Sequence, residues 1–135
     1  MMRRNGPDKI LIVEDERITA EDLADIVRGL GYEVSGVVSS GAEAIRLVEI
    51  DPPDLVLMDI RIKGDMDGTE TARILRERFD VSVVFLTAHA DRETLERAKQ
   101  ARPVGYIVKP FHESELHASV EIALHQHRHD RRAVI

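Results

Sequence analysis

The sequence predicts an α/β fold in which helices cover both faces of a mostly parallel, five-stranded sheet. Short runs of β-branched and leucine residues recur five times along the chain. A longer amphipathic stretch follows each run, and in these stretches the apolar residues return at the three- and four-residue steps of a helix. Strand–helix units repeated in this way are typical of a doubly wound α/β domain.

The elements follow from these runs in order. The first helical stretch carries Ile18, Leu23 and Val27 on its apolar side, and Gly31 is placed to cap its end. A second helix ends before Pro52-Pro53, because proline does not continue a helix. Three more helices are expected near 69–79, near 92–101 and from His112 onward. The strands are expected near 9–13, 33–38, 54–58, 82–86 and 104–108.

Five such units fit a flavodoxin-like (βα)5 domain with strand order 2-1-3-4-5. In this order the first and third strands are neighbours, so we expect Glu14, Asp15 and Asp59 to lie together at the point where the strand order reverses. We expect a single domain over residues 8–126. Residues 127–135 are expected to form a polar C-terminal tail, frayed or solvated, or the start of a linker.

Composition excludes several classes of function. The chain has 135 residues and no cysteine, which removes disulfide frameworks and thiolate chemistry. Its apolar runs are too short to span a bilayer, and the N-terminus does not resemble a secretory signal, so a cytoplasmic location without membrane contact is expected. The net charge of −6 argues against direct nucleic-acid binding.

Reactive polar residues stand at the ends of four predicted strands. Asp59 closes one strand, Glu14-Asp15 follows another, and Thr87 and Lys109 follow two more. Each alone is an ordinary strand-end residue. Together they would gather at one edge of a parallel sheet, where carboxylates about 4 Å apart repel by about 4 kcal/mol at an effective dielectric near 20. Such a group requires a cation or a raised pKa.

The chemistry predicted for this edge is phosphoryl transfer assisted by Mg²⁺. Magnesium binds through one or two carboxylates, waters and phosphate oxygens. Asp59 is the candidate nucleophile, forming an aspartyl phosphate. Lys109 would pair with the phosphoryl oxygens, and the Thr87 hydroxyl would donate a hydrogen bond to them. The Lys109-Pro110 peptide bond is either an ordinary trans turn or a cis bond, which is realistic only before proline.

As a set, these motifs resemble the CheY-like receiver domain of two-component response regulators, over residues 8 to about 126. The quoted matches are the acidic pair Glu14-Asp15, Met58-Asp59, Met66-Asp67-Gly68, Leu86-Thr87-Ala88 and Lys109-Pro110-Phe111. The resemblance implies a phosphoacceptor signalling module with self-phosphorylation and self-dephosphorylation chemistry, rather than an enzyme acting on outside substrates.

The resemblance also implies a role for individual residues. Asp59 is the phosphoacceptor, and Lys109 binds the phosphoryl group. The metal ligands are Glu14, Asp15, Asp59 and the backbone carbonyl of Arg61, and the cofactor is Mg²⁺. Thr87 and Tyr106 form the switch pair, and the Lys109-Pro110 bond is cis. The phosphate donor is a histidine kinase or a phosphotransfer protein, and an unknown output partner reads the surface of the fourth helix, fifth strand and fifth helix. The same surface is the candidate interface of a homodimer, although the sequence does not decide the oligomeric state.

The chain departs from the family pattern around the site. Residues 60–65 form a loop one residue longer than is usual, and Lys63 stands where proline is common, so a bulged loop is expected. Arg61 lies where side chains tune the lifetime of the phosphoryl group; it pairs with Glu14 in the metal-free state or is solvated. His89 lies where a side chain screens or admits the hydrolytic water, so a role in lifetime is also expected.

Other functions were weighed on specific residues. A haloacid-dehalogenase-type phosphatase also uses an aspartate nucleophile, but it needs a second aspartate where this chain has Arg61. A flavin or nucleotide module needs a phosphate cradle after the first strand, where this chain has Glu14-Asp15. The intact site argues against a degenerate receiver. His125 and His129 share a helical face, yet a solvated helix end is favoured over a metal clamp. The sequence does not decide between a stand-alone receiver and part of a larger protein.

Overall fold

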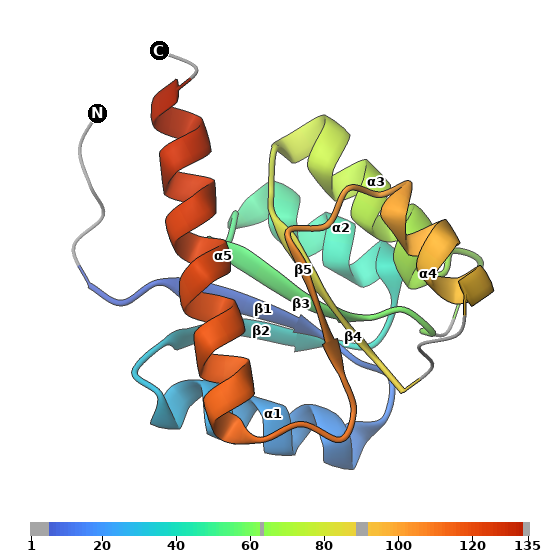
Figure 1. Ribbon diagram of the computed structural model, residues 1–135. Coiled ribbons are helices and arrows are strands. Elements are labelled where there is room, and N and C mark those ends of the chain that lie inside the picture. Colours follow the sequence, from blue (N-terminus) through green and yellow to red (C-terminus); the bar gives the residue numbers. More distant parts are fainter. Residues whose placement is uncertain (1–5, 63, 89–91, 134–135) are drawn as a thin grey trace.

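The computed structural model describes residues 6–62, 64–88 and 92–133, with side chains as far as residue 127. Strands and helices alternate through these residues (Figure 1). The strands are β1 (Lys9–Val13), β2 (Glu33–Val38), β3 (Leu55–Asp59), β4 (Val83–Thr87) and β5 (Gly105–Val108). The helices are α1 (Arg17–Gly29), α2 (Gly41–Ile50), α3 (Gly68–Phe79), α4 (Arg92–Lys99) and α5 (Glu113–Ala133).

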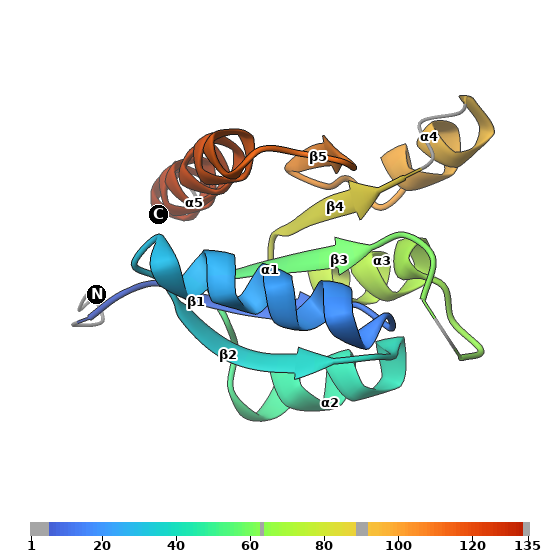
Figure 2. The same ribbon diagram turned by 90° about the horizontal axis from the view of Figure 1, so that it is seen from below.

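The five strands form one parallel sheet in the order β2-β1-β3-β4-β5, which confirms the predicted topology. Helices cover both faces of the sheet (Figures 1 and 2). Because side chains alternate along a strand, β1 sends Ile10 and Ile12 into the layer under α1 and α5, and Leu11 and Val13 into the layer under α2, α3 and α4. The central strands are buried on both faces, which explains their continuous apolar runs.

The first helix corrects one predicted core residue. Ala20, Leu23, Ala24 and Val27 form the buried stripe of α1, whereas Ile18 is 77% exposed. Ile18 precedes Ala20 by two residues, which is about 200° around a helix, so it lies on the opposite side from the core. The predicted cap at Gly31 is confirmed. Gly31 follows the end of α1 and has φ +99°, a positive value that glycine commonly adopts after the last turn of a helix.

The fifth helix continues to Ala133, into the segment 127–135 that was expected to be a polar C-terminal tail or the start of a linker. Within this extension, His127 is half-buried, and its Nδ1 lies 2.7 Å from the Ser82 hydroxyl at the start of β4. This contact could not be predicted from the sequence, because Ser82 and His127 are 45 positions apart.

No helix within the described ranges has the length and apolar character needed to cross a bilayer.

Candidate functional site

The sheet register brings the predicted strand-end residues to one edge. Val13 pairs with Met58, so Glu14 and Asp59 follow on adjacent strands. Asp59 pairs in turn with Leu86, so Thr87 follows one residue later on β4. Thr87 pairs with Val108, which places Lys109 directly after β5. Parallel strands converge in this way because all of their carboxyl ends point to the same edge.

Lys109 joins the two acidic strand ends. Its Nζ lies 2.7 Å from Oδ2 of Asp59 and 3.5 Å from Oε2 of Glu14. The other oxygen of Asp59 accepts a hydrogen bond of 2.9 Å from the backbone N–H of Arg61. The Glu14 side chain is only 1% exposed, while those of Asp59 and Lys109 are 15% and 20% exposed. The Asp59 carboxylate is thus oriented by fixed donors yet still reaches solvent.

The two carboxyl groups titrate differently because they share one cation. Burial, a hydrogen bond to Asp59 and the charge of Asp59 raise the pKa of Glu14 to about 7. Burial alone would raise the pKa of Asp59, but hydrogen bonds from Glu14, Lys109 and the Arg61 N–H outweigh it and lower that pKa. Asp59 is therefore the ionised member of the pair near neutral pH, and Glu14 is the member that takes up a proton.

Lys109 remains charged in this setting. Burial would lower the pKa of its ammonium group, but the hydrogen bond to Asp59 and the charges of Asp59 and Glu14 raise it above the ordinary value. One buried acid, Glu14, and one partly exposed acid, Asp59, opposite a single ammonium leave the site with surplus negative potential whenever Glu14 is ionised. A further cation would relieve that surplus.

The donor set fits a small oxygen-binding cation. In the described ranges, no group of three or more His, Cys, Asp or Glu side chains is close enough together to hold a metal ion. Magnesium does not require such a group, since it uses one or two carboxylates and keeps several waters. Glu14 and Asp59 supply the adjacent pair of carboxylates, and the half-buried Asp15 follows Glu14 in the chain.

The start of α3 is pressed against the end of β3. The Gly68 N–H donates to the Ile60 carbonyl at 2.8 Å. A Cβ atom added at Gly68 would lie 2.4 Å from the backbone oxygen of Asp59 and 2.7 Å from that of Ile60. Only glycine allows this approach, which explains the glycine in the Met66-Asp67-Gly68 motif.

The predicted switch residues lie on neighbouring strands. Thr87 is 2% exposed at the end of β4, whereas Tyr106 on β5 is 37% exposed, and its ring centre lies 6.3 Å from that of Phe85. The Lys109-Pro110 bond is cis, as the resemblance implied. The Arg61 side chain is exposed, and Glu14 is paired with Lys109 instead. His89 lies outside the described residues.

One charged contact near the site was not predicted. Arg97 on α4 forms an ion pair with Asp67, the residue that caps α3. The motif Met66-Asp67-Gly68 marked Asp67 as the start of a helix, but no local pattern links it to an arginine 30 positions later in the chain.

The sequence model of the response regulator receiver domain family matches residues 10–121 of the chain. The chain belongs to this family. Receiver domains of response regulators are signalling modules of two-component systems, so the predicted resemblance and the predicted class of function are confirmed. Neither the family model nor the relatives named below support the alternative of a haloacid-dehalogenase-type phosphatase.

Curated relatives of this receiver domain are longer proteins. The present chain is 38% identical over 122 residues to the transcriptional regulatory protein PdtaR of Mycobacterium tuberculosis. The match covers 90% of this chain and 59% of PdtaR. The chain is 35% identical over 117 residues to the phyllosphere-induced regulator PhyR of Methylorubrum extorquens, covering 86% of this chain and 43% of PhyR. The chain thus spans about half the length of the curated relatives it matches.

Solved structures agree with the fold. The signal receiver domain of a modulated diguanylate cyclase from Desulfovibrio desulfuricans superposes with a TM-score of 0.87 at 40% identity, covering 92% of this chain and 98% of that one. The receiver domain of a sensor histidine kinase from Pseudomonas aeruginosa, with a magnesium ion coordinated in its active site cleft, gives a TM-score of 0.80 at 31% identity, covering 88% and 98%.

Proposed function

We propose that Asp59 of this receiver domain accepts a phosphoryl group. The observation that carries the proposal is the position of its carboxylate, held between the Lys109 ammonium at 2.7 Å and the Arg61 N–H at 2.9 Å. The lowered pKa of Asp59 means that its carboxylate is ionised at neutral pH, as a nucleophile must be. Its partial exposure leaves a path for a donor.

The transfer is a displacement at phosphorus. A carboxylate oxygen of Asp59 forms the new O–P bond while the bond from phosphorus to the donor's imidazole nitrogen breaks, and that nitrogen keeps the electron pair. The Lys109 ammonium releases Asp59 and pairs with the phosphoryl oxygens, offsetting the added charge. Hydrolysis by water then returns the carboxylate and releases phosphate, which is the self-dephosphorylation expected from the sequence.

We assign the magnesium ligands to Glu14, Asp15, Asp59 and the Arg61 carbonyl. Bound there, Mg²⁺ supplies charge neutralisation and orientation for the incoming phosphoryl group. The raised pKa of Glu14 supports the assignment, because burial and the neighbouring Asp59 carboxylate both disfavour the charged form that a bound cation would stabilise. The magnesium ion in the cleft of the Pseudomonas aeruginosa receiver domain supports it as well.

We infer that Thr87 and Tyr106 carry the signal to the surface of α4, β5 and α5. Shifting a two-state element from 1:99 to 99:1 needs about 5.5 kcal/mol. Hydrogen bonds to a charged group contribute about 1.5–3 kcal/mol each, so new contacts from Thr87 and Lys109 to the phosphoryl group would supply most of this. The ring of Tyr106 is partly exposed, so an inward turn that accompanies a movement of Thr87 would change this surface. Tuning of the phosphoryl lifetime by Arg61 and His89 stays a prediction.

The partners follow from the same chemistry. We infer that the donor is a sensor histidine kinase or a phosphotransfer protein and that an output partner reads the switched surface. Exposed apolar side chains of Tyr106, Val108 and Ile122 on β5 and α5 are consistent with a homodimer through α4, β5 and α5. The net charge of −6 does not favour direct nucleic-acid binding by this chain. A cytoplasmic location stays a prediction.

The decisive experiment is intact-mass measurement after incubation with acetyl phosphate and Mg²⁺. The wild-type chain should gain one phosphoryl group, and Asp59→Asn should gain none because its amide is not a nucleophile. Asp65→Asn is the matched control, since Asp65 is an exposed aspartate in the loop that follows β3, and it should label like the wild type. Equal labelling of wild type and Asp59→Asn would refute the assignment.

The metal assignment is tested without any phosphoryl donor. At pH 8, Mg²⁺ at ten times its dissociation constant should stabilise the chain by about 1.4 kcal/mol, seen as a rise of several degrees in Tm. Asp59→Asn should lose most of this rise, while Asp65→Asn should keep it. Equal rises in all three proteins would place the ion elsewhere.

A further inference from the structure

The loop between β3 and α3 touches the proposed phosphorylation site at one end and α4 at the other. At its start, the Arg61 N–H donates to the Asp59 carboxylate. At its end, the carboxylate of Asp67 forms an ion pair with Arg97 on α4. Gly68 then packs against the backbone of Asp59, so the first turn of α3 has little freedom to move away from β3. A mechanical connection from Asp59 to α4 therefore exists in this fold.

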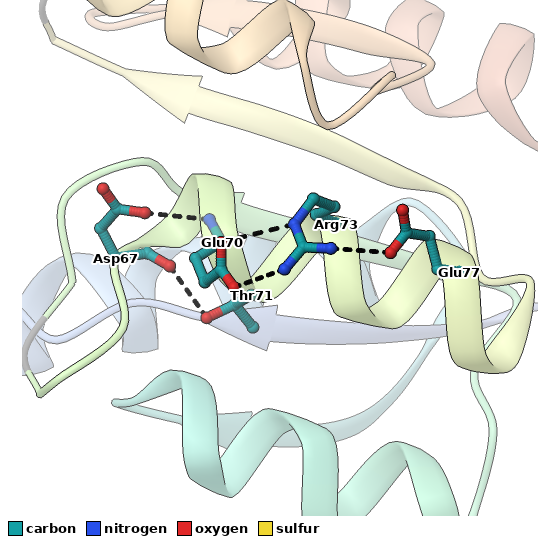
Figure 3. A network of polar contacts seen from close by, with 5 residues as sticks. All are labelled: Asp67, Glu70, Thr71, Arg73 and Glu77. Carbon is teal, nitrogen blue, oxygen red and sulfur yellow. Dashed lines mark hydrogen bonds and ion pairs between the residues drawn. The ribbon is translucent and has the colours of Figure 1, made fainter.

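Asp67 is well suited to orient this contact. One carboxylate oxygen accepts a hydrogen bond of 2.9 Å from the Glu70 N–H, and the Asp67 carbonyl accepts another of 2.9 Å from the Thr71 hydroxyl. Glu70 is itself held by Arg73, which also binds Glu77 (Figure 3). The second carboxylate oxygen of Asp67 takes no part in this α3 network and is the one that meets Arg97. Contacts within α3 thus orient the Asp67 carboxylate toward Arg97.

Helix α4 depends on polar contacts such as the Asp67–Arg97 ion pair more than the neighbouring helices do. Its buried side chains are those of Thr94 and Ala98, which are both small. The other helices of the same layer bury Val48 or Leu75, and α5 buries several large aliphatic residues. Because the free energy of burial scales with apolar area, α4 is held to the sheet by a weaker apolar contact.

A second contact supports the same pairing of helices. The Arg76 guanidinium on α3 donates a hydrogen bond of 3.1 Å to the carbonyl of Arg102, just after α4. Arg102 has φ +51°, the left-handed conformation that ends a helix, and this turns its carbonyl toward α3. Both polar contacts tie α4 to α3, whose own start is fixed against Asp59.

We propose that the Asp67–Arg97 bridge is a positioning device that biases α4 toward its unphosphorylated arrangement and so opposes phosphorylation of Asp59. The inference rests on the proposed function of Asp59. A bridge that forms only in the unphosphorylated arrangement stabilises that arrangement, so by linkage its removal favours the phosphorylated state. An exposed ion pair of this kind accounts for a two- to fivefold shift in such an equilibrium.

The chain offers closely matched variants for the test. Asp67→Asn keeps a side-chain oxygen that caps α3, because asparagine is as good a cap as aspartate, but removes the charge opposite Arg97. Arg97→Gln removes the other charge. Arg28→Gln is the control, since Arg28 is an exposed arginine whose ion pair with Asp25 is confined to α1. Two measurements are made on each protein, together with the Asp67→Asn, Arg97→Gln double variant.

The first measurement is hydrogen exchange of the peptide that covers α4, without any phosphoryl donor. Exchange should be at least twofold faster in Asp67→Asn and in Arg97→Gln and unchanged in Arg28→Gln. The second is the initial rate of labelling by acetyl phosphate with Mg²⁺, which should rise two- to fivefold in both single variants. The double variant should exceed neither, because the two charges act as one contact. In 1 M salt the differences should vanish, since the pair is exposed.

The proposed role of the bridge would be contradicted by unchanged exchange in α4, by slower labelling of the single variants, or by additive effects in the double variant. A wild-type chain that takes no label removes the proposed function and this coupling together. A labelled wild type whose variants label at the same rate removes the coupling alone.

Discussion

The two ends of the sheet contain similar residues that are arranged differently. At the carboxyl ends of the strands, Lys109 faces Glu14 and Asp59, whose side chains are 1% and 15% exposed. At the opposite end, the Lys9 ammonium lies 2.9 Å from Asp51, which is 43% exposed, and the Lys9 N–H donates to Asp54 at 2.7 Å. Both ends use a lysine to join acids from other segments.

The difference between the ends is the ratio of charges and their access to water. At the Lys9 end, one ammonium meets one exposed carboxylate, and a backbone N–H serves the other acid, so each charge is satisfied by the protein or by solvent. At the Lys109 end, the buried carboxyl group of Glu14 and the partly exposed one of Asp59 compete for a single ammonium, and the pKa of Glu14 rises to about 7. The first arrangement is complete as a structural contact, whereas the second is balanced only when a proton or a cation joins it.

The largest effect is expected when the ammonium is removed from the buried end. Lys109→Met keeps the apolar stem but leaves Glu14 and Asp59 facing each other without a cation. Removing one partner of a buried pair strands the other charge, so the free energy of unfolding should fall by about 2–4 kcal/mol at pH 8. Urea unfolding followed by circular dichroism measures it. The loss should shrink at pH 5.5, where Glu14 is protonated; a loss of equal size at both pH values would mean that lost packing is responsible.

An effect of opposite sign is expected from Glu14→Gln. The native state binds the Glu14 proton more tightly than the unfolded chain does, because burial and Asp59 raise the pKa from its ordinary 4.5 to about 7. Wild-type stability should therefore fall as the pH rises from about 4.5 to about 7, by at most about 3 kcal/mol. The amide of glutamine does not titrate, so the variant should match the wild type near pH 4.5 and exceed it at pH 8.

The measurements on Glu14→Gln are confined to pH 4.5 and above, because protonation of Asp59 affects stability at lower pH. The pKa of Asp59 is lowered, so its contribution to stability is present above its ordinary pKa of 3.8 and is lost as the pH falls below that. Measurements from pH 4.5 to 8 isolate Glu14 from this opposing change. Parallel pH profiles for the variant and the wild type would show that Glu14 does not carry the surplus charge of the site.

The sequence predicted which residues meet at the carboxyl ends of the strands, but not the energetics of that site or the contacts at the opposite end. Asp59, Thr87 and Lys109 could be placed together because strand ends in a parallel sheet are fixed by topology, which the apolar runs reveal. Which acid takes up the proton could not be predicted, since nothing in the sequence indicates that Glu14 is the side chain buried at the end of the strand. The Asp67–Arg97 bridge was also missed, because it joins residues far apart in the chain.

The smallest effect is expected at the other end of the sheet, from Lys9→Met. This variant removes the ammonium from Asp51 but keeps the backbone N–H that serves Asp54. Exposed ion pairs contribute about 0–1 kcal/mol, so Tm should fall by no more than about 4 °C, by equal amounts at pH 5.5 and pH 8. Thermal unfolding beside Lys109→Met gives the direct contrast. If Lys9→Met were as destabilising as Lys109→Met, or showed the same dependence on pH, burial of the acids would not be what separates the reactive end of this sheet from the structural one.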